Sequence, residues 1–175
     1  MRSRRIGQRL SETSEEKRGE NSKMPRVESV FRVKLPVRAV WSFMSDRNEV
    51  GCLFPGCKGV KIIDELDALW KVRVTFGPFV RIVDLKTHTT VFKEFEQLSW
   101  IGSGGDIHMS GDVLLKKISD DETEVIYHLE GHVTGPFAML QDIVVAEKLR
   151  EVKKKFIKNI KNELEWQLEE DVEKK

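Results

Sequence analysis

Cysteine is scarce in this sequence, because its 175 residues include two, Cys52 and Cys57. So few cysteines exclude a disulfide-rich scaffold. A structural zinc site needs four ligands, and the four histidines of the chain lie far from this pair in the sequence. We therefore predict no metal site. Buried free thiols are the favoured interpretation of both cysteines, and a disulfide between them stays open.

Long apolar runs are also missing. No run approaches the roughly 20 residues that cross a bilayer, and the basic residues near the N-terminus are not followed by the apolar stretch of a secretory signal. We therefore expect a cytoplasmic protein. Its net charge is +1, and so small a bulk charge gives no reason to expect a nucleic-acid partner.

Nucleotide-binding loops are absent as well. The sequence has no G-x-G-x-x-G between a strand and a helix and no G-K-[ST]. We predict no cofactor. The glycines Gly102, Gly104, Gly105 and Gly111 are expected instead to bend the chain, and a bulge is plausible at Gly111.

Apolar residues are sparse in residues 1–25, which carry many charges. Such a segment cannot bury enough surface to order itself, so we predict a disordered tail. Met24, near its end, is an alternative start. The remaining length suits one domain, predicted over residues 26–170, with a disordered end at 171–175.

Turning to what is present, strand signals dominate the chain from Val27 to Val133. Apolar residues alternate with polar ones over 27–35, and six further strands are predicted between residues 60 and 133. Two short helices are expected after Pro36, the second over Glu49 to Phe54. Short connections between the strands favour antiparallel neighbours.

A long helix is predicted from Gly135-Pro136 to about Glu170. Its apolar residues recur at steps of three to five and trace one stripe: Phe137, Leu140, Val144, Leu149, Val152, Phe156, Ile160 and Leu164. The predicted fold is α+β, a curved seven-stranded antiparallel sheet around this C-terminal helix. A gap between sheet and helix, lined with apolar side chains, is a default ligand site.

Two segments carry a family resemblance. Residues 40–57, VWSFMSDRNEVGCLFPGC, resemble the helix-loop motif of the CoxG family of carbon monoxide dehydrogenase subunits, within the helix-grip superfamily of START domains and polyketide cyclases (SRPBCC). The matching positions are Trp41, Phe43, Asp46, Val50, Cys52, Pro55 and Gly56. A second match is GHVTGPFAML, residues 131–140, and Phe156 also fits. The resemblance covers about residues 26–165.

This resemblance implies a hydrophobic cavity without catalytic machinery. It further implies an accessory role beside a molybdenum-containing dehydrogenase, in maturation or in linking that enzyme to the membrane and its quinone pool. The basic run in the middle of the long helix is compatible with weak peripheral membrane contact, although a solvated face is the favoured interpretation of it.

Inward-facing positions give a predicted ligand site of large apolar or aromatic residues. They are Trp70, Val72, Val74, Phe76, Trp100, Met109, Tyr127, Leu129, Phe137, Leu140 and Val144. Such a lining suits a quinone, an isoprenoid or another lipid-like molecule. Charged metabolites fit it poorly, because no inward Arg or Lys is expected. The competing interpretation is that these side chains fill a close-packed core.

Two pairs of residues are candidates for acid–base chemistry, Asp106 with His108 and Tyr127 with His128. Both histidines alternate with apolar neighbours and are predicted to face solvent, which does not suit catalysis. We predict no catalytic residues. A cyclase-like enzyme using the same pocket, and an interaction protein with a vestigial pocket, remain as alternatives.

Overall fold

Seven strands form one antiparallel sheet in the computed structural model, which describes residues 24–76, 78–135, 138 and 141–173. The strands are β1 (Arg26–Val33), β2 (Cys57–Ile62), β3 (Asp67–Phe76), β4 (Phe79–Lys93), β5 (Gln97–Gly104), β6 (Ile107–Lys117) and β7 (Thr123–Val133). Their order in the sheet is β1-β7-β6-β5-β4-β3-β2. The prediction of a seven-stranded antiparallel sheet is confirmed. Of the predicted tail, the described residues include Met24 and Pro25 alone.

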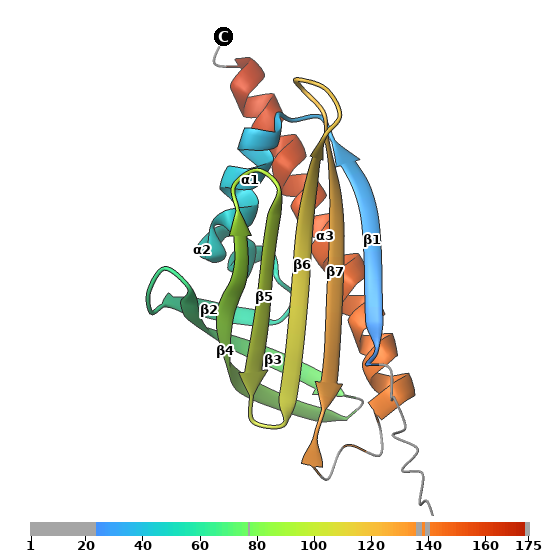
Figure 1. The fold of residues 1–175 in the computed structure, drawn as a ribbon. Helices are drawn as coiled ribbons and strands as arrows, with labels where there is room; N and C mark the ends of the chain where they lie inside the picture. The colour runs from blue at the N-terminus through green and yellow to red at the C-terminus, as the bar shows by residue number, and fades with distance from the viewer. Residues whose placement is uncertain (1–23, 77, 136–137, 139–140, 174–175) are drawn as a thin grey trace, which may run out of the picture.

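The sheet is strongly curved. Its longest strand, β4, shifts register against β5 between Thr89 and Val91, and β2 shifts against β3 between Cys57 and Gly59. Such irregularities bend strands and increase their twist. As a result β2 and β3 run at a steep angle to β6 and β7, and the helices lie on one face of the sheet (Figure 1).

The two short helices are α1 (Val37–Ser45) and α2 (Arg47–Leu53). Asp46 separates them, and its carboxylate accepts hydrogen bonds from the backbone N–H groups of Asn48 at 2.8 Å and Glu49 at 3.2 Å. An aspartate in this position satisfies N–H groups that the first turn leaves free. The cap explains why α2 begins at Arg47, ahead of the predicted start at Glu49.

The long helix is α3 (Gln141–Glu173), and its predicted start was wrong. Gly135 has a φ of 72°, in the left-handed region that a right-handed helix does not use. The helix therefore begins later than Gly135-Pro136, and it continues past residue 170. None of the helices in the described chain combines the length and the apolarity needed to cross a membrane.

The core of the domain lies between α3 and the β1–β7 side of the sheet. Most tertiary contacts of α3 are made with β1, β7 and α2, and Asn159 donates a hydrogen bond of 2.9 Å to the Leu53 carbonyl of α2. Phe156, Ile160 and Leu164 of its apolar stripe are almost fully buried. Toward β3, β4 and β5 the helix makes fewer contacts, so the sheet and the helix are less closely packed on that side.

Gly111 has a different purpose from the predicted bend or bulge. The ladders that join β6 to β5 and β7 run through it without a register shift, and Trp100 lies opposite it on β5. A Cβ atom at Gly111 would lie 2.6 Å from the Trp100 ring, closer than carbon atoms approach. The missing side chain therefore makes room for the indole.

Candidate functional site

A cavity of about 110 Å³, here called the inner cavity, lies between the sheet, α2 and α3. Its walls are mainly aromatic and aliphatic. They include Phe54, Trp70, Val72, Leu85, Trp100, Met109, Val113, Tyr127 and Phe156. Rings set part of this wall, since Phe54 and Phe156 pack edge to face with centroids 5.4 Å apart. Concave apolar surfaces of this kind are where proteins bind small molecules.

A larger, more open space of about 480 Å³, here called the outer cleft, adjoins the inner cavity. The two share Phe54, Val72 and Met109 in their walls. The apolar floor of the outer cleft includes Val74, Val145 and Leu149. Its rim carries charged groups: Arg73, Lys148, Glu151 and Lys155. The arrangement provides an enclosed inner end and an opening toward solvent beside the first turns of α3.

The predicted ligand-site residues are only partly brought together. Trp70, Val72, Trp100, Met109 and Tyr127 line the inner cavity. Val74 lines the outer cleft, as do Val72 and Met109. These positions come from alternate residues of β3 and from facing residues of β5, β6 and β7, as inward parity on a sheet requires. That they bind a ligand remains a prediction.

Other predicted residues lie elsewhere. Leu129 is 0% exposed and packs in the closed core rather than in the described wall of either space. Val144 is 36% exposed, and its neighbour Val145 faces the outer cleft instead. The error follows from the helix start, because a stripe counted from Gly135-Pro136 begins too early. Phe137, Leu140 and the Phe76 side chain lie outside the described residues.

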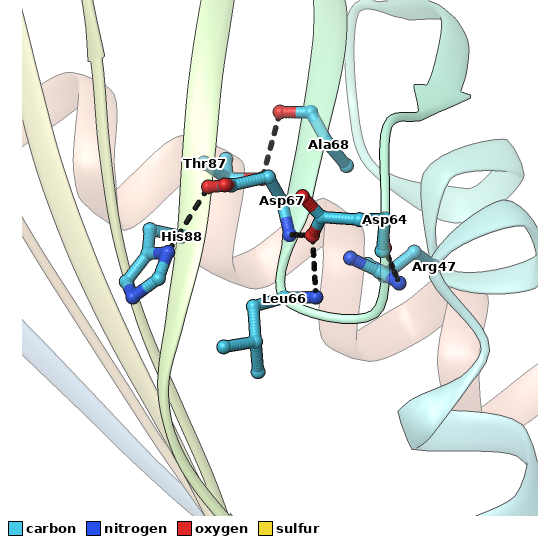
Figure 2. Close-up of polar contacts among 7 residues, drawn as sticks. All are labelled: Arg47, Asp64, Leu66, Asp67, Ala68, Thr87 and His88. Carbon is cyan, nitrogen blue, oxygen red and sulfur yellow. Dashed lines mark hydrogen bonds and ion pairs between the residues drawn. The ribbon is translucent and has the colours of Figure 1, made fainter.

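The expectation that no arginine or lysine faces the site is wrong. Arg47, the first residue of α2, lines the inner cavity. One terminal nitrogen, Nη2, donates a hydrogen bond of 2.9 Å to the Asp64 carbonyl, and Figure 2 shows the other terminal nitrogen directed away from that contact. Parity arguments missed Arg47 because they apply to strands, whereas this side chain enters from a short helix. The available signal was Asp46, a strong N-cap residue that fixes where α2 begins.

Two buried hydrogen-bond donors of the inner cavity have no acceptor in the described part of the chain. They are Nη1 of Arg47 and Nε1 of Trp70. Leaving a buried donor unpaired costs about 1–3 kcal/mol, and more for a charged group. Native proteins avoid this cost at most buried polar atoms, so these two atoms mark the polar end of the cavity.

The turn between β2 and β3 holds Arg47 in place (Figure 2). The Asp64 carboxylate accepts hydrogen bonds from the backbone N–H groups of Asp67 at 2.7 Å and Leu66 at 2.9 Å. These bonds lower the pKa of the Asp64 carboxyl, and Arg47 adds a smaller effect of the same sign. Thr87 closes the adjoining strand pair by donating to the Ala68 carbonyl at 3.2 Å. The result is a compact turn that presents one carbonyl to the guanidinium.

Tyr127 is the other polar side chain deep in the cavity wall. It is 2% exposed and packs edge to face against Phe156, with ring centroids 5.4 Å apart. Burial raises the pKa of its phenol well above the usual range. Tyr127 is therefore a neutral hydroxyl at physiological pH.

Neither candidate acid–base pair is assembled. The Asp106 carboxylate is bound by Arg81 at 3.0 Å, while the His108 ring stacks on His132 with centroids 4.8 Å apart. Tyr127 and His128 occupy successive positions of β7 and so point to opposite faces of the sheet. His128 is also less exposed than predicted, because its ring lies 2.7 Å from the Glu28 carboxylate and is largely covered.

Both cysteines are free thiols, but the expectation that both are buried is wrong. Cys52 is exposed on α2, and Cys57 is half-buried at the start of β2. Burial raises the pKa of the Cys57 thiol. Within the described ranges, no three residues among His, Cys, Asp and Glu are grouped as metal ligands.

Comparison with known families gives a match over most of the fold. The family model of CoxG, a carbon monoxide dehydrogenase protein, matches residues 30–165. The chain belongs to the CoxG family. Its resemblance to that family at residues 40–57 and 131–140 is thereby confirmed. A comparison with curated protein sequences gives no match.

Solved structures similar to this CoxG chain establish the fold. A conserved protein of Geobacillus kaustophilus has a TM-score of 0.69 at 21% identity, covering 79% of this chain and 94% of its own. A START superfamily protein of Mycobacterium smegmatis has a TM-score of 0.68 at 15% identity, with coverages of 81% and 97%. The Zhui aromatase/cyclase of Streptomyces sp. R1128 has a TM-score of 0.61 at 16% identity, with coverages of 85% and 96%. The CoxG chain thus has the START-like helix-grip fold.

Proposed function

We propose that this CoxG chain binds an apolar small molecule, such as a quinone, an isoprenoid or a lipid-like compound, without transforming it. The observation that carries the proposal is the apolar inner cavity opening into the outer cleft. An engineered core cavity of about 150 Å³ holds benzene. The inner cavity, at about 110 Å³, suits one ring or a group of similar size.

The outer cleft accommodates the rest of such a ligand. Its volume of about 480 Å³ lies within the range of small-molecule sites, roughly 300–1,000 Å³. An apolar chain placed along Val74, Val145 and Leu149 would leave the inner cavity toward solvent. This is the geometry that a carrier needs, because a ligand enters and leaves through the same opening.

The cellular role that we propose is that of an accessory protein to a molybdenum-containing dehydrogenase of the carbon monoxide dehydrogenase type. Support comes from the family itself, whose description assigns CoxG to carbon monoxide dehydrogenase. Maturation of that enzyme, or a link between it and a membrane quinone pool, would use a bound quinone. We place this role in the cytoplasm, with peripheral contact at the membrane.

A second candidate function is a cyclase-like enzyme, favoured by the fold shared with the Zhui aromatase/cyclase. Such chemistry needs a group that exchanges protons near neutral pH. Among the described lining residues of the inner cavity, the titratable side chains are Arg47, Glu65 and Tyr127. Arginine stays protonated, Tyr127 stays neutral and Glu65 is exposed. We therefore favour binding over catalysis.

The proposal is tested with Val74→Trp, which narrows the outer cleft. Val74 is half-buried, so in an open cleft the larger ring should cost less than about 1 kcal/mol of unfolding free energy and should abolish binding of a short-tailed menaquinone, measured by calorimetry. The control is Val125→Trp, because Val125 is fully buried in the closed core and overpacking there should cost roughly 1–3 kcal/mol or more.

Two results together would refute binding. The first is equal destabilisation by both substitutions, which would mean that the cleft is filled core. The second is the absence of any quenching of wild-type tryptophan fluorescence by added menaquinone, since Trp70 and Trp100 lie in the cavity wall. Mass spectrometry of an organic extract of the purified protein then identifies a natural ligand directly.

A further inference from the structure

The unpaired donors of the inner cavity come from two elements that meet. Gly51 lies four residues after Arg47 on α2, so the two positions are on the same face of that helix. A Cβ atom at Gly51 would lie 3.5 Å from Cζ3 of Trp70. The helix face that carries Arg47 is therefore packed against the indole of Trp70. Both donor-bearing side chains border one end of the cavity.

Each of these side chains is held in position by other contacts. Nη2 of Arg47 is fixed on the Asp64 carbonyl, which directs the remaining nitrogen, Nη1, to the buried side. The Trp70 ring packs edge to face against Phe54, with centroids 6.1 Å apart, and its strand is paired on both sides with β2 and β4. Neither side chain can turn to another acceptor without breaking a contact, so the two N–H groups are preorganised.

We propose that Arg47 and Trp70 bind an sp² oxygen, a carbonyl or a carboxylate, at one end of an otherwise apolar ligand. The inference rests on the proposed function and specifies what that site recognises. Both groups donate and neither accepts, so they select an acceptor. A charged donor forms stronger hydrogen bonds than a neutral one, which makes Arg47 the main determinant and Trp70 the secondary one.

This arrangement also sets the direction of binding. The acceptor end lies in the inner cavity against α2, and the apolar chain runs past Val72 and Met109 into the outer cleft. The opposite direction would bury a hydrocarbon end against two unpaired donors. A pure hydrocarbon of the same shape would bind more weakly for the same reason.

The experiment compares three ligands on the full chain by calorimetry at pH 7.5. They are a short-tailed naphthoquinone, the naphthalene with the same tail but no carbonyl, and a fatty acid. Wild type should prefer the quinone, the fatty acid or both over the naphthalene. Arg47→Met should weaken binding of the preferred acceptor ligand about 10-fold to 100-fold, and Trp70→Phe about 2-fold to 10-fold. Neither substitution should change the affinity for the naphthalene.

Arg150→Met is the matched control, since it removes the same charge from an exposed position of α3 and should leave all three affinities unchanged. Preference for the fatty acid or for the quinone identifies carboxylate or carbonyl as the acceptor, and either supports the proposal. Equal binding of quinone and naphthalene to wild type, or equal losses for both in Arg47→Met, overturns it while apolar binding stands. If no ligand binds wild type, the proposed function falls, and this inference falls with it.

Discussion

The two sides of this sheet are built from the same alternating pattern but differ in how they treat buried polar atoms. On the β1–β7 side, under α3, the buried hydroxyl of Thr123 donates to the Leu35 carbonyl at 2.8 Å, and the surrounding aliphatic and aromatic residues form a closed core. On the β3–β5 side, beside α2, the indole N–H of Trp70 and one guanidinium nitrogen of Arg47 are buried without a partner in the described chain.

This difference separates core from site better than apolar burial does. Tyr127 and Phe156 border the cavity and are as buried as Leu129, which lies in the closed core. Apolar burial stabilises both sides. An unpaired donor, in contrast, destabilises the empty protein, so its persistence on one side points to a ligand that supplies the acceptor.

The largest effect that tests this comparison is expected from Phe156→Ala. Phe156 is 2% exposed between α3 and the sheet, and truncation of such a ring costs about 3–5 kcal/mol. Phe92→Ala is the matched control on the cavity side, where the ring is 57% exposed, and it should cost less than about 1.5 kcal/mol. Urea unfolding measures both. Equal costs would show that the two sides do not differ in packing.

A smaller effect is expected where Trp100 enters the cavity wall. Gly111→Ala places a Cβ atom 2.6 Å from that ring and should cost roughly 1–3 kcal/mol by overpacking. Gly131→Ala on the neighbouring strand is the control, because its Cβ would meet no atom closer than 3.5 Å. Adding Trp100→Leu to Gly111→Ala should restore part of the loss. If Gly111→Ala and Gly131→Ala unfold at the same urea concentration, Gly111 does not serve to seat the indole.

The fold was predictable from the sequence because its signals are local and repeated. Alternation identified all seven strands, and the buried stripe through Phe156, Ile160 and Leu164 identified α3. The start of α3 was not predictable in this way. Gly135-Pro136 is a common way to begin a helix, and the left-handed φ of Gly135 is set by the tertiary structure.

The candidate site was predictable only where it is made of strands. Inward parity placed Trp70, Trp100 and Tyr127 toward the cavity, but Arg47 reaches it from a helix whose position depends on the distant turn at Asp64. Leu129 shows the other limit of parity, since an inward residue faces either a cavity or a filled core. Which of the two it faces depends on where α3 lies, and no local pattern specifies that.

The smallest predicted effect lies at the outer cleft, where the rings of His108 and His132 stack. Burial, and then the neighbouring His108, lowers the pKa of His132 below its ordinary value. Just below the ordinary histidine pKa of about 6.5, the unfolded chain therefore binds a proton at this position more readily than the folded chain. Stability from His132 should be complete above that pH and should be lost as the pH falls through the lowered pKa.

The measurement is the thermal unfolding midpoint of wild type and of His132→Gln between pH 7.5 and pH 5.5. Glutamine keeps a polar side chain and does not titrate, so the wild-type midpoint should fall relative to the variant as the pH decreases. His88→Gln is the control, since that ring lies on β4 near Asp67, away from the stacked pair. A wild-type midpoint that rises relative to His132→Gln on acidification would mean that the folded protein binds the proton more tightly at His132. The rim of the cleft would then favour a positive charge at that residue, contrary to the stacked arrangement of two neutral rings.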